Sequence, residues 1–311
     1  MSDIQPFGPP EAVIPLPARA HTLDISNDGS LLVVSMNHVR DGAPAIRVHG
    51  LPSGELLATV DTQHSRGAVF VDDGDAIVYL RNLETPAVAL ERLAWREPGS
   101  EPQDLGASPL SIRKLVRSHS GSLLAVVGSD LEVFSLAEDR TIRFLKGPKR
   151  SGELVACFSR DERSIYIAHL EEGQLIQQDL RSGEELARWP IKPDNGGQII
   201  VSKSGRFVAL HGRRGAAIFD GDTPLYSTGK LKYRRRTGTV ALFDGDESFA
   251  ALPMLGAPWL LALTDESGWL QKTEGDYPGL NTIAAKAHDA EVYAWAREDS
   301  EFKHDVLVYR R

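Results

Sequence analysis

The residues best suited to binding chemistry form one short run of cations. Residues 230–236 read KLKYRRR, in a chain of 311 residues whose formal net charge is −8. Arginine makes paired hydrogen bonds to carboxylates and phosphates, and arginine and tyrosine are enriched at interface hot spots. The run is therefore either a site for an acidic protein segment or phosphate, or a solvated connector. Its binding candidates are Lys230, Lys232, Tyr233, Arg234, Arg235 and Arg236.

The sequence offers little catalytic chemistry. Nine histidines are spread along the chain without an HxH, HExxH or CxxC pair, so no metal-ligand spacing is evident. There is also no GxSxG elbow and no glycine-rich phosphate loop. The one cysteine, Cys157, lies in an apolar run, where a small buried thiol is the ordinary interpretation. We therefore expect no catalytic residues, no metal and no cofactor.

The elements that must position these residues are short strands. Residues 23–60 contain four apolar runs of strand length, at 23–26, 31–35, 46–49 and 56–60, separated by turn-forming residues. The same order of runs and turns recurs along the whole chain at spacings of 41 to 47 residues. Seven units of this length predict the blades of a propeller. The turns centre near Asp28, Asp73, Ser120, Asp161, Ser204, Gly245 and Asp289.

The last unit, 280–311, ends after a third strand, DVLVYRR. Residues 11–16, EAVIPL, precede the first unit and can supply the missing fourth strand. Pro15 requires that this strand be outermost, because proline cannot donate to a second neighbour. The sequence thus predicts one domain, 1–311, whose seventh blade is shared between about 11–16 and 280–311.

Two pairs of segments carry a family resemblance. They are SNDGSLLVVS with IRVHGLPSGELLATV, and FSRDERSIYIA with LIQQDLRSGEELARW. This pattern resembles the WD-repeat and YVTN-type seven-bladed β-propellers, although no third strand ends in Trp-Asp and no Gly-His dipeptide precedes a unit. The resemblance implies an all-β fold, a seven-bladed β-propeller of four-stranded antiparallel blades closed by the N-terminal strand. A β-sandwich or two small barrels are the alternatives.

The resemblance also sorts the loops onto two faces. Links between blades emerge on the same face as the links from second to third strands, which implies that 230–236 neighbours Arg213 and Arg214. Lys149 and Arg150 follow further round that face. We call these ten residues the basic arc. The hairpins of the opposite face are rich in aspartate and glutamate, and we expect that face to be negatively charged, although turn chemistry alone explains such residues.

Together these features favour a non-catalytic protein-binding platform, either an adaptor or complex subunit or a toxin-neutralising partner. We expect its partner to be another protein that presents an acidic surface or segment to the basic arc. The alternative is a small-molecule enzyme, lactonase-like or dehydrogenase-like, with a site at the top mouth of the central channel. Such a site would draw on His64, Arg66, His211 and Arg213.

Composition limits the classes of partner and the cellular compartment that we expect for this protein. Aromatic residues make up 7% of the chain and the net charge is negative, which argues against specific nucleic-acid binding. No apolar run approaches the roughly 18 residues that a membrane span requires. A single cysteine and an N-terminus without the pattern of a secretory signal both favour a reducing cytosol, so we expect a cytoplasmic protein. The alternative is a cysteine-poor periplasmic protein whose leader has been removed. The excess of arginine over lysine hints at a bacterial source.

Overall fold

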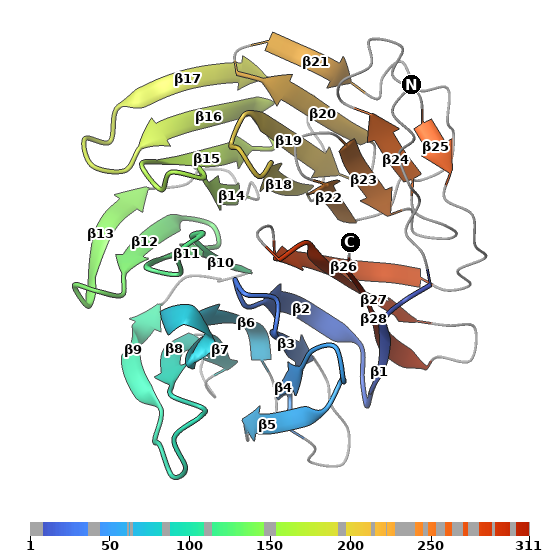
Figure 1. Cartoon of the computed structure of the whole chain (residues 1–311). Coiled ribbons are helices and arrows are strands. Elements are labelled where there is room, and N and C mark those ends of the chain that lie inside the picture. Colours follow the sequence, from blue (N-terminus) through green and yellow to red (C-terminus); the bar gives the residue numbers. More distant parts are fainter. Residues whose placement is uncertain are drawn as a thin grey trace. The chain divides into compact units, whose positions relative to one another are not determined.

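The computed structural model (Figure 1) contains seven four-stranded sheets. It describes residues 9–36, 44–60, 62, 65–82, 88–108, 114–145, 154–191, 197–212, 215–221, 223–227, 240–244, 248–252, 259–262, 270–272, 280–287, 290–298 and 303–310. The chain divides into two compact units, Pro9–Gly147 with Ile283–Arg311, and Pro148–Thr282. The prediction of a single domain over 1–311 stays a prediction.

The first unit holds four sheets, and the second unit holds three. In strand order, the sheets of the first unit are β1 (Ala12–Leu16), β28 (His304–Arg310), β27 (Val292–Glu298) and β26 (Leu280–Ala287); β2 (Ala20–Ile25), β3 (Leu31–Met36), β4 (Ile46–Gly50) and β5 (Leu56–Val60); β6 (Ser65–Val71), β7 (Ala76–Asn82), β8 (Val88–Leu93) and β9 (Gln103–Ser108); and β10 (Lys114–Arg117), β11 (Leu123–Val127), β12 (Leu131–Ser135) and β13 (Arg140–Leu145). Those of the second unit are β14 (Leu154–Phe158), β15 (Ser164–His169), β16 (Gln174–Asp179) and β17 (Glu185–Pro190); β18 (Gly197–Val201), β19 (Phe207–Gly212), β20 (Gly215–Asp220) and β21 (Thr223–Ser227); and β22 (Val240–Asp244), β23 (Ser248–Leu252), β24 (Trp259–Ala262) and β25 (Leu270–Lys272).

Sheets of the first unit pack face to face in chain order. Strand β6 contacts β2, β3 and β10, and β2 also contacts β27. Strand β3 is covered on both faces, because its side chains join two different cores. Leu32 and Val34 join the core shared with β27 and β28, whereas Leu31 and Val33 join the core shared with β6 and β7. Because side chains alternate along a strand, a strand buried on both faces needs the unbroken apolar run seen here.

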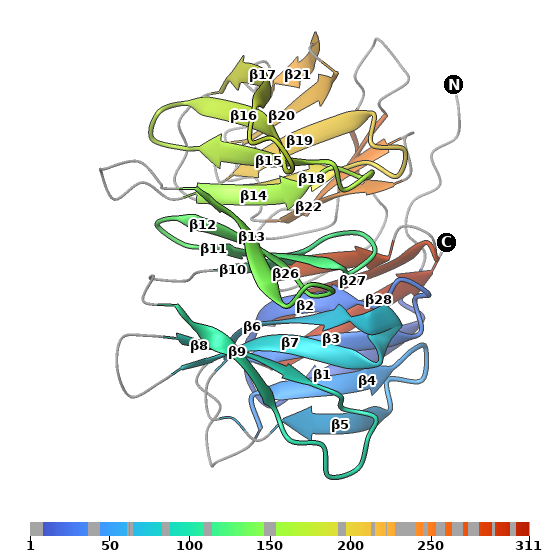
Figure 2. The ribbon, with the colours of Figure 1, turned by 90° about the vertical axis from the view of Figure 1, so that its left-hand side faces the viewer.

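The second unit is built on the same principle. Strand β14 lies beside β18, and β18 lies beside β22 (Figure 2). Trp189 of β17 is buried between the sheet of β14–β17 and the sheet of β18–β21. The centroid of its ring lies 6.2 Å from that of Tyr166 and 5.8 Å from that of Phe219. Aromatic rings at such separations bury a large apolar area and fix how the sheets face each other.

Strand β1 completes the sheet formed by the C-terminal strands, as the sequence predicts. It pairs antiparallel with β28, with Ala12 opposite Val308 and Leu16 opposite His304. Ile14, 2% exposed, joins the buried core of the first unit. Pro15 is tolerated because β1 is the outermost strand and has a single hydrogen-bonded neighbour. The first and last strands of the chain thus share one sheet.

A buried serine organises the first hairpin in four of the sheets. In the β18–β19 hairpin, the Ser202 hydroxyl accepts a hydrogen bond from the Phe207 amide at 3.1 Å, and Gly205 donates to the Ser202 carbonyl at 3.0 Å. The same backbone-to-hydroxyl bond recurs five residues after the serine in each case, so the turn satisfies a buried amide that the ladder leaves free. The four serines are Ser26, Ser118, Ser159 and Ser202.

The hairpins between third and fourth strands share a bulge. Pairing shifts register in five sheets, between β4 and β5, β8 and β9, β12 and β13, β16 and β17, and β20 and β21. In two of these hairpins a side chain of the third strand donates to the carbonyl of a left-handed glycine: His49 to Gly54 at 3.0 Å and Gln178 to Gly183 at 2.7 Å. Both of these hairpins read Ser-Gly-Glu at the turn, where glycine permits the left-handed conformation beside the bulge.

The helical content of the described chain is one short 3-10 turn, η1 (Asp72–Gly74). No helix in this part of the chain is long and apolar enough to cross a membrane.

Removing β1 should destabilise the protein. Deleting residues 1–17 removes the burial of Ile14 and Leu16, each worth about 1.5–3 kcal/mol, together with the ladder to β28. We expect the free energy of unfolding, measured by urea denaturation, to fall by at least about 3 kcal/mol. Deleting residues 1–8, which precede β1, is the control and should change it little. An unchanged denaturation midpoint after the longer deletion would refute the structural role of β1.

The serine turn predicts a matched pair of substitutions. Ser202→Ala leaves the buried Phe207 amide without its acceptor and should cost about 1–3 kcal/mol. Ser204→Ala, in the same turn, removes an exposed acceptor that water can replace and should cost less than about 0.5 kcal/mol. Chemical denaturation of both variants measures the difference. Equal effects would mean that the hydroxyl of Ser202 does not hold the turn.

Candidate interaction surfaces

The sequence-predicted binding residues lie outside the described residues. This holds for the whole basic arc: Lys149, Arg150, Arg213, Arg214, Lys230, Lys232, Tyr233, Arg234, Arg235 and Arg236. It also holds for His64 and for the side chains of Arg66 and His211, which the enzyme alternative invokes. Both ideas therefore stay predictions.

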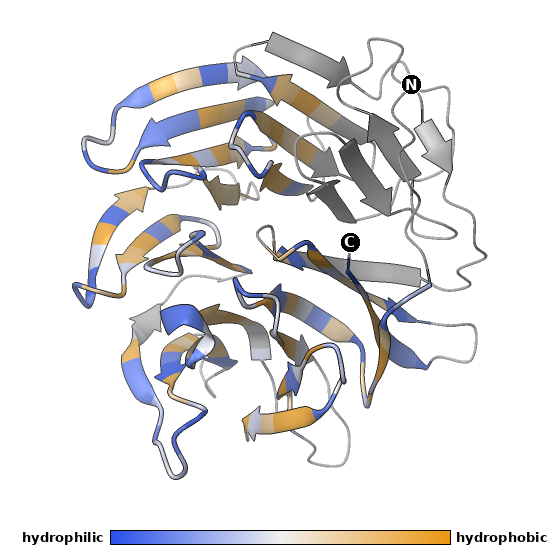
Figure 3. Cartoon of the chain, in the orientation of Figure 1, coloured by the Kyte–Doolittle hydropathy of each residue, from blue (hydrophilic) through white to orange (hydrophobic). Residues whose placement is uncertain are grey.

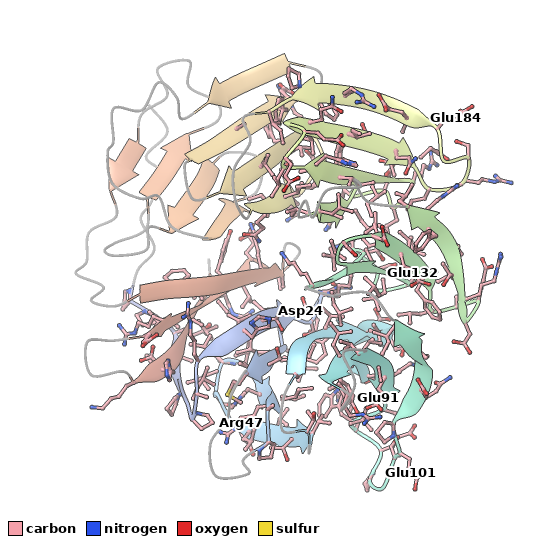
Figure 4. The ribbon with its side chains drawn as sticks, turned by 180° about the vertical axis from the view of Figure 1, so that it is seen from behind. Asp24, Arg47, Glu91, Glu101, Glu132 and Glu184 are labelled. Atoms are coloured by element: carbon pink, nitrogen blue, oxygen red, sulfur yellow. The ribbon has the colours of Figure 1, made fainter. Side chains whose placement is uncertain are left out.

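Arginines of the same sheet pair with several carboxylates of the predicted acidic face. Asp75 pairs with Arg96 at 3.0 Å, and Asp72 accepts two hydrogen bonds from Arg92. Comparable ion pairs lie at hairpins of three other sheets. Glu184, labelled in Figure 4, lies in one of these hairpins. Local pairing of this kind weakens the field that the hairpin carboxylates project. These pairs are Glu138 with Arg140, Glu185 with Arg188, and Asp220 with Arg206.

Two other hairpin aspartates serve the turns themselves. The hydrogen bond from the Ser159 hydroxyl, at 2.7 Å, holds the pKa of Asp161 below its ordinary value. Burial raises the pKa of Asp28, but hydrogen bonds from Ser26 and Ser30 outweigh that effect and lower it. Carboxylates engaged in this way stay charged and hold the loop. Turn chemistry and local ion pairing thus account for these hairpin carboxylates without a partner.

Histidine, cysteine and carboxylate groups do not gather into a metal site within the described ranges, where no group of three could hold an ion.

A largely buried network joins three sheets of the first unit. Asp24 of β2, marked in Figure 4, accepts hydrogen bonds from the Phe70 amide of β6 at 2.8 Å and from Arg117 Nε of β10 at 2.7 Å. Arg117 also donates to the carbonyl of Ile25 at 2.7 Å and to the side chain of Asn27 at 2.8 Å. The side chains of Asp24 and Arg117 are 15% and 12% exposed.

This network is a structural clamp. Burial raises the pKa of the Asp24 carboxyl, while the positive charge of Arg117 opposes that shift. Each nitrogen of the Arg117 guanidinium donates a hydrogen bond to a neighbouring group of this unit, which fixes the relative positions of the sheets. Sequence reasoning missed the pair because its members are 93 residues apart. The available signal was Asp24 itself, a charged residue between Leu23 and Ile25 of β2, whereas Arg117 is the last residue of the short strand KLVR and gives no comparable signal.

Exposed apolar side chains concentrate on outermost strands. The large hydrophobic residues that are exposed in the described chain all lie on the last strand of a sheet. An outermost strand also carries backbone groups that no neighbour pairs. The outer edges are therefore the described surfaces best suited to contact another molecule. The residues are Val13 on β1, Leu56 and Leu57 on β5, Phe144 on β13 and Leu186 on β17.

Comparison with known proteins identifies the architecture. No protein-family model and no curated protein matches the sequence. A chain in a "Crystal Structure of Mitotic Checkpoint Complex" is similar, with a TM-score of 0.70 and 13% sequence identity, over 100% of this chain and 94% of that chain. The protein is therefore an all-β β-propeller of four-stranded antiparallel blades, as predicted. Closure of its seven sheets into one seven-bladed ring stays a prediction.

The likeness is widely shared, since 1650 chains of solved structures are similar to this one. It defines the class of fold and does not by itself assign a function.

The clamp predicts strong coupling between its two charges. Asp24→Ala or Arg117→Met alone leaves one buried charge without its partner and should cost about 3–5 kcal/mol. The double variant should cost less than the sum of the two, by about 1–3 kcal/mol. The exposed pair Glu185 and Arg188 is the control, for which the same cycle should give less than about 1 kcal/mol. Urea denaturation of the variants measures both cycles, and additive effects at Asp24 and Arg117 would contradict the clamp.

Proposed function

We propose that this protein is a non-catalytic protein-binding platform, either an adaptor or complex subunit or a toxin-neutralising partner. The observation that carries the proposal is the β-propeller framework, whose described hairpins are fixed by repeated side-chain hydrogen bonds. A preorganised framework that presents varied loops loses little conformational entropy on binding. The similar solved chain belongs to a mitotic checkpoint complex, which fits a role in an assembly.

In this proposal the seven sheets are the blades of one closed ring, of the WD-repeat or YVTN type. Support comes from the seven four-stranded sheets, from the pairing of β1 with β28, and from the similarity over the full chain. The proposal also includes a cytoplasmic protein of bacterial origin, which rests on the composition of the sequence alone.

The proposed partner surface is the basic arc, which would take an acidic surface or segment of another protein. Its support is the density of cations, five within residues 230–236. The acidic hairpins are a weaker candidate for the partner surface, because several of their carboxylates already pair with arginines of their own sheet. Arginine forks suit a carboxylate-rich ligand because each can make two parallel hydrogen bonds.

Charge reversal tests the basic arc. In affinity capture from native lysate, Arg234→Glu with Arg235→Glu should release the captured protein partner at lower salt or lose it, because acidic ligands are then repelled. The matched control is Arg181→Glu with Lys203→Glu, an equal change in charge at two exposed hairpin positions. If both double variants retain the same partners with the same salt dependence as the parent protein, the basic arc is not the interface.

The enzyme alternative has its own discriminating measurement. Elemental analysis and mass spectrometry of the purified protein would detect a tightly held metal or small molecule. A metal held by three protein ligands at the channel mouth would overturn the platform proposal in favour of the enzyme.

A further inference from the structure

The outer edges of the seven sheets differ in how they are protected against pairing with another strand. Natural proteins shield such edges with proline, charged side chains or bulges, because an unprotected edge adds further strands. Five of the outermost strands, β5 included, share a bulge, so proline and charge are what distinguish one edge from another. Six of the seven outermost strands that the structure describes carry a proline or a charged side chain. These residues are Pro15 in β1, Asp104 in β9, Arg140 and Arg143 in β13, Arg188 and Pro190 in β17, Pro224 in β21, and Lys272 in the three-residue β25.

Strand β5 is the exception. Its sequence, LLATV, has no proline, no charge and no glycine. Leu56 and Leu57 are 46% and 44% exposed, and Thr59 is exposed as well. In Figure 3 the strand is coloured as hydrophobic along much of its length. The pairing register jumps from His49 opposite Leu56 to Val48 opposite Ala58, so Leu57 is the additional residue of the bulge.

Hydrogen bonds of the β4–β5 hairpin fix the conformation of β5. Its hairpin is closed by backbone hydrogen bonds from Gly50 to Glu55 at 2.9 Å and from Gly54 to Gly50 at 2.8 Å. His49, 3% exposed, donates to the Gly54 carbonyl and fixes the left-handed glycine. A preformed strand loses little conformational entropy when another strand pairs with it. The outer edge of β5 thus offers unpaired backbone groups, two apolar side chains and a fixed geometry together.

Charge decides which occupant fits this edge. Exposed Glu55 lies directly before β5, and the whole chain carries a net charge of −8. A second copy would bring the same acidic group and the same net charge to the interface, and like charges disfavour such pairing. A segment of another protein that alternates apolar side chains and carries lysine or arginine at its ends satisfies both the apolar and the electrostatic features.

We propose that the outer edge of β5 binds an extended, apolar segment of another protein, flanked by cations, through β-strand addition. The backbone ladder supplies affinity, and contacts with Leu56 and Leu57 supply selectivity. This surface is separate from the basic arc and prefers the opposite charge in its ligand. A negative result at the basic arc would therefore leave the proposal for β5 unaffected, and the reverse also holds.

A defined peptide tests the proposal. The probe is an acetylated, amidated and fluorescently labelled Lys-Val-Thr-Val-Thr-Val-Lys, titrated with the full chain and followed by anisotropy. We expect saturable binding that is at least tenfold weaker for the same peptide N-methylated at its five central residues, because methylation removes the donors of the ladder. A peptide with glutamate in place of both lysines should also bind more weakly, because Glu55 repels it.

Matched variants locate the binding edge. Leu57→Lys places a protecting charge on β5 and should weaken binding at least tenfold, whereas Leu186→Lys, at a 54% exposed position of the already protected β17, should leave it unchanged. Thermal unfolding checks that both variants fold. Where Leu57→Lys lowers the midpoint, Thr59→Lys on the same strand decides.

Three outcomes would overturn the proposal. The first is no saturable binding to the parent chain. The second is equal binding to the parent, Leu57→Lys and Leu186→Lys chains, which would place the peptide elsewhere. The third is self-association of the parent chain that Leu57→Lys abolishes, measured by analytical ultracentrifugation, because the occupant would then be a second copy.

Discussion

Each four-stranded sheet ends in two strands whose outward backbone N–H and C=O groups have no partner in that sheet. Buried groups of this kind are costly unless they are satisfied, and exposed ones invite further strands. The first unit satisfies one such edge through side chains of the neighbouring sheet. Thr22 and Asp24 of β2 accept hydrogen bonds from the Ala68 and Phe70 amides of β6, at 3.2 and 2.8 Å. Sheet packing and edge protection are thus achieved by the same contacts.

This constraint explains why a charged pair is buried where an apolar contact would pack well. A buried ion pair often contributes little net stability, because desolvation of both charges offsets their attraction. However, an apolar side chain at Asp24 would leave the Phe70 amide without an acceptor, and the sheets would lose a directional contact. Arg117 then compensates the carboxylate and extends the network to β10. The value of the pair therefore lies in geometry more than in net energy.

The repeat spacing predicted the strands well because strand length and turn chemistry are local. The prediction for 56–60 matches β5, and 31–35 falls one residue short of β3. The prediction for 23–26 placed Ser26 in the strand, whereas β2 ends at Ile25 because the Ser26 hydroxyl organises the turn. That serine recurs two positions before the turn centre in four units, so aligning the units with one another would have revealed it.

Contacts between sheets could not be predicted in the same way. Asp24 and Arg117 meet only when three sheets stack, and neither position stands out by spacing alone. The prediction of a negative hairpin face overlooked arginines that pair with hairpin carboxylates up to 21 residues away along the chain. The sequence did indicate the basic arc, but its residues lie outside the described part of the chain.

The two proposed surfaces rest on different physical interactions, and this difference makes them separable. Exposed arginine–carboxylate contacts are screened by salt, so binding at the basic arc should weaken steeply with ionic strength. At β5 most of the attraction comes from a backbone ladder and apolar side chains, which salt hardly screens, and only the flanking cations respond. A ligand for the basic arc must be acidic, whereas acidic flanks oppose binding beside Glu55. One molecule can therefore use both surfaces only if opposite charges are segregated along its chain.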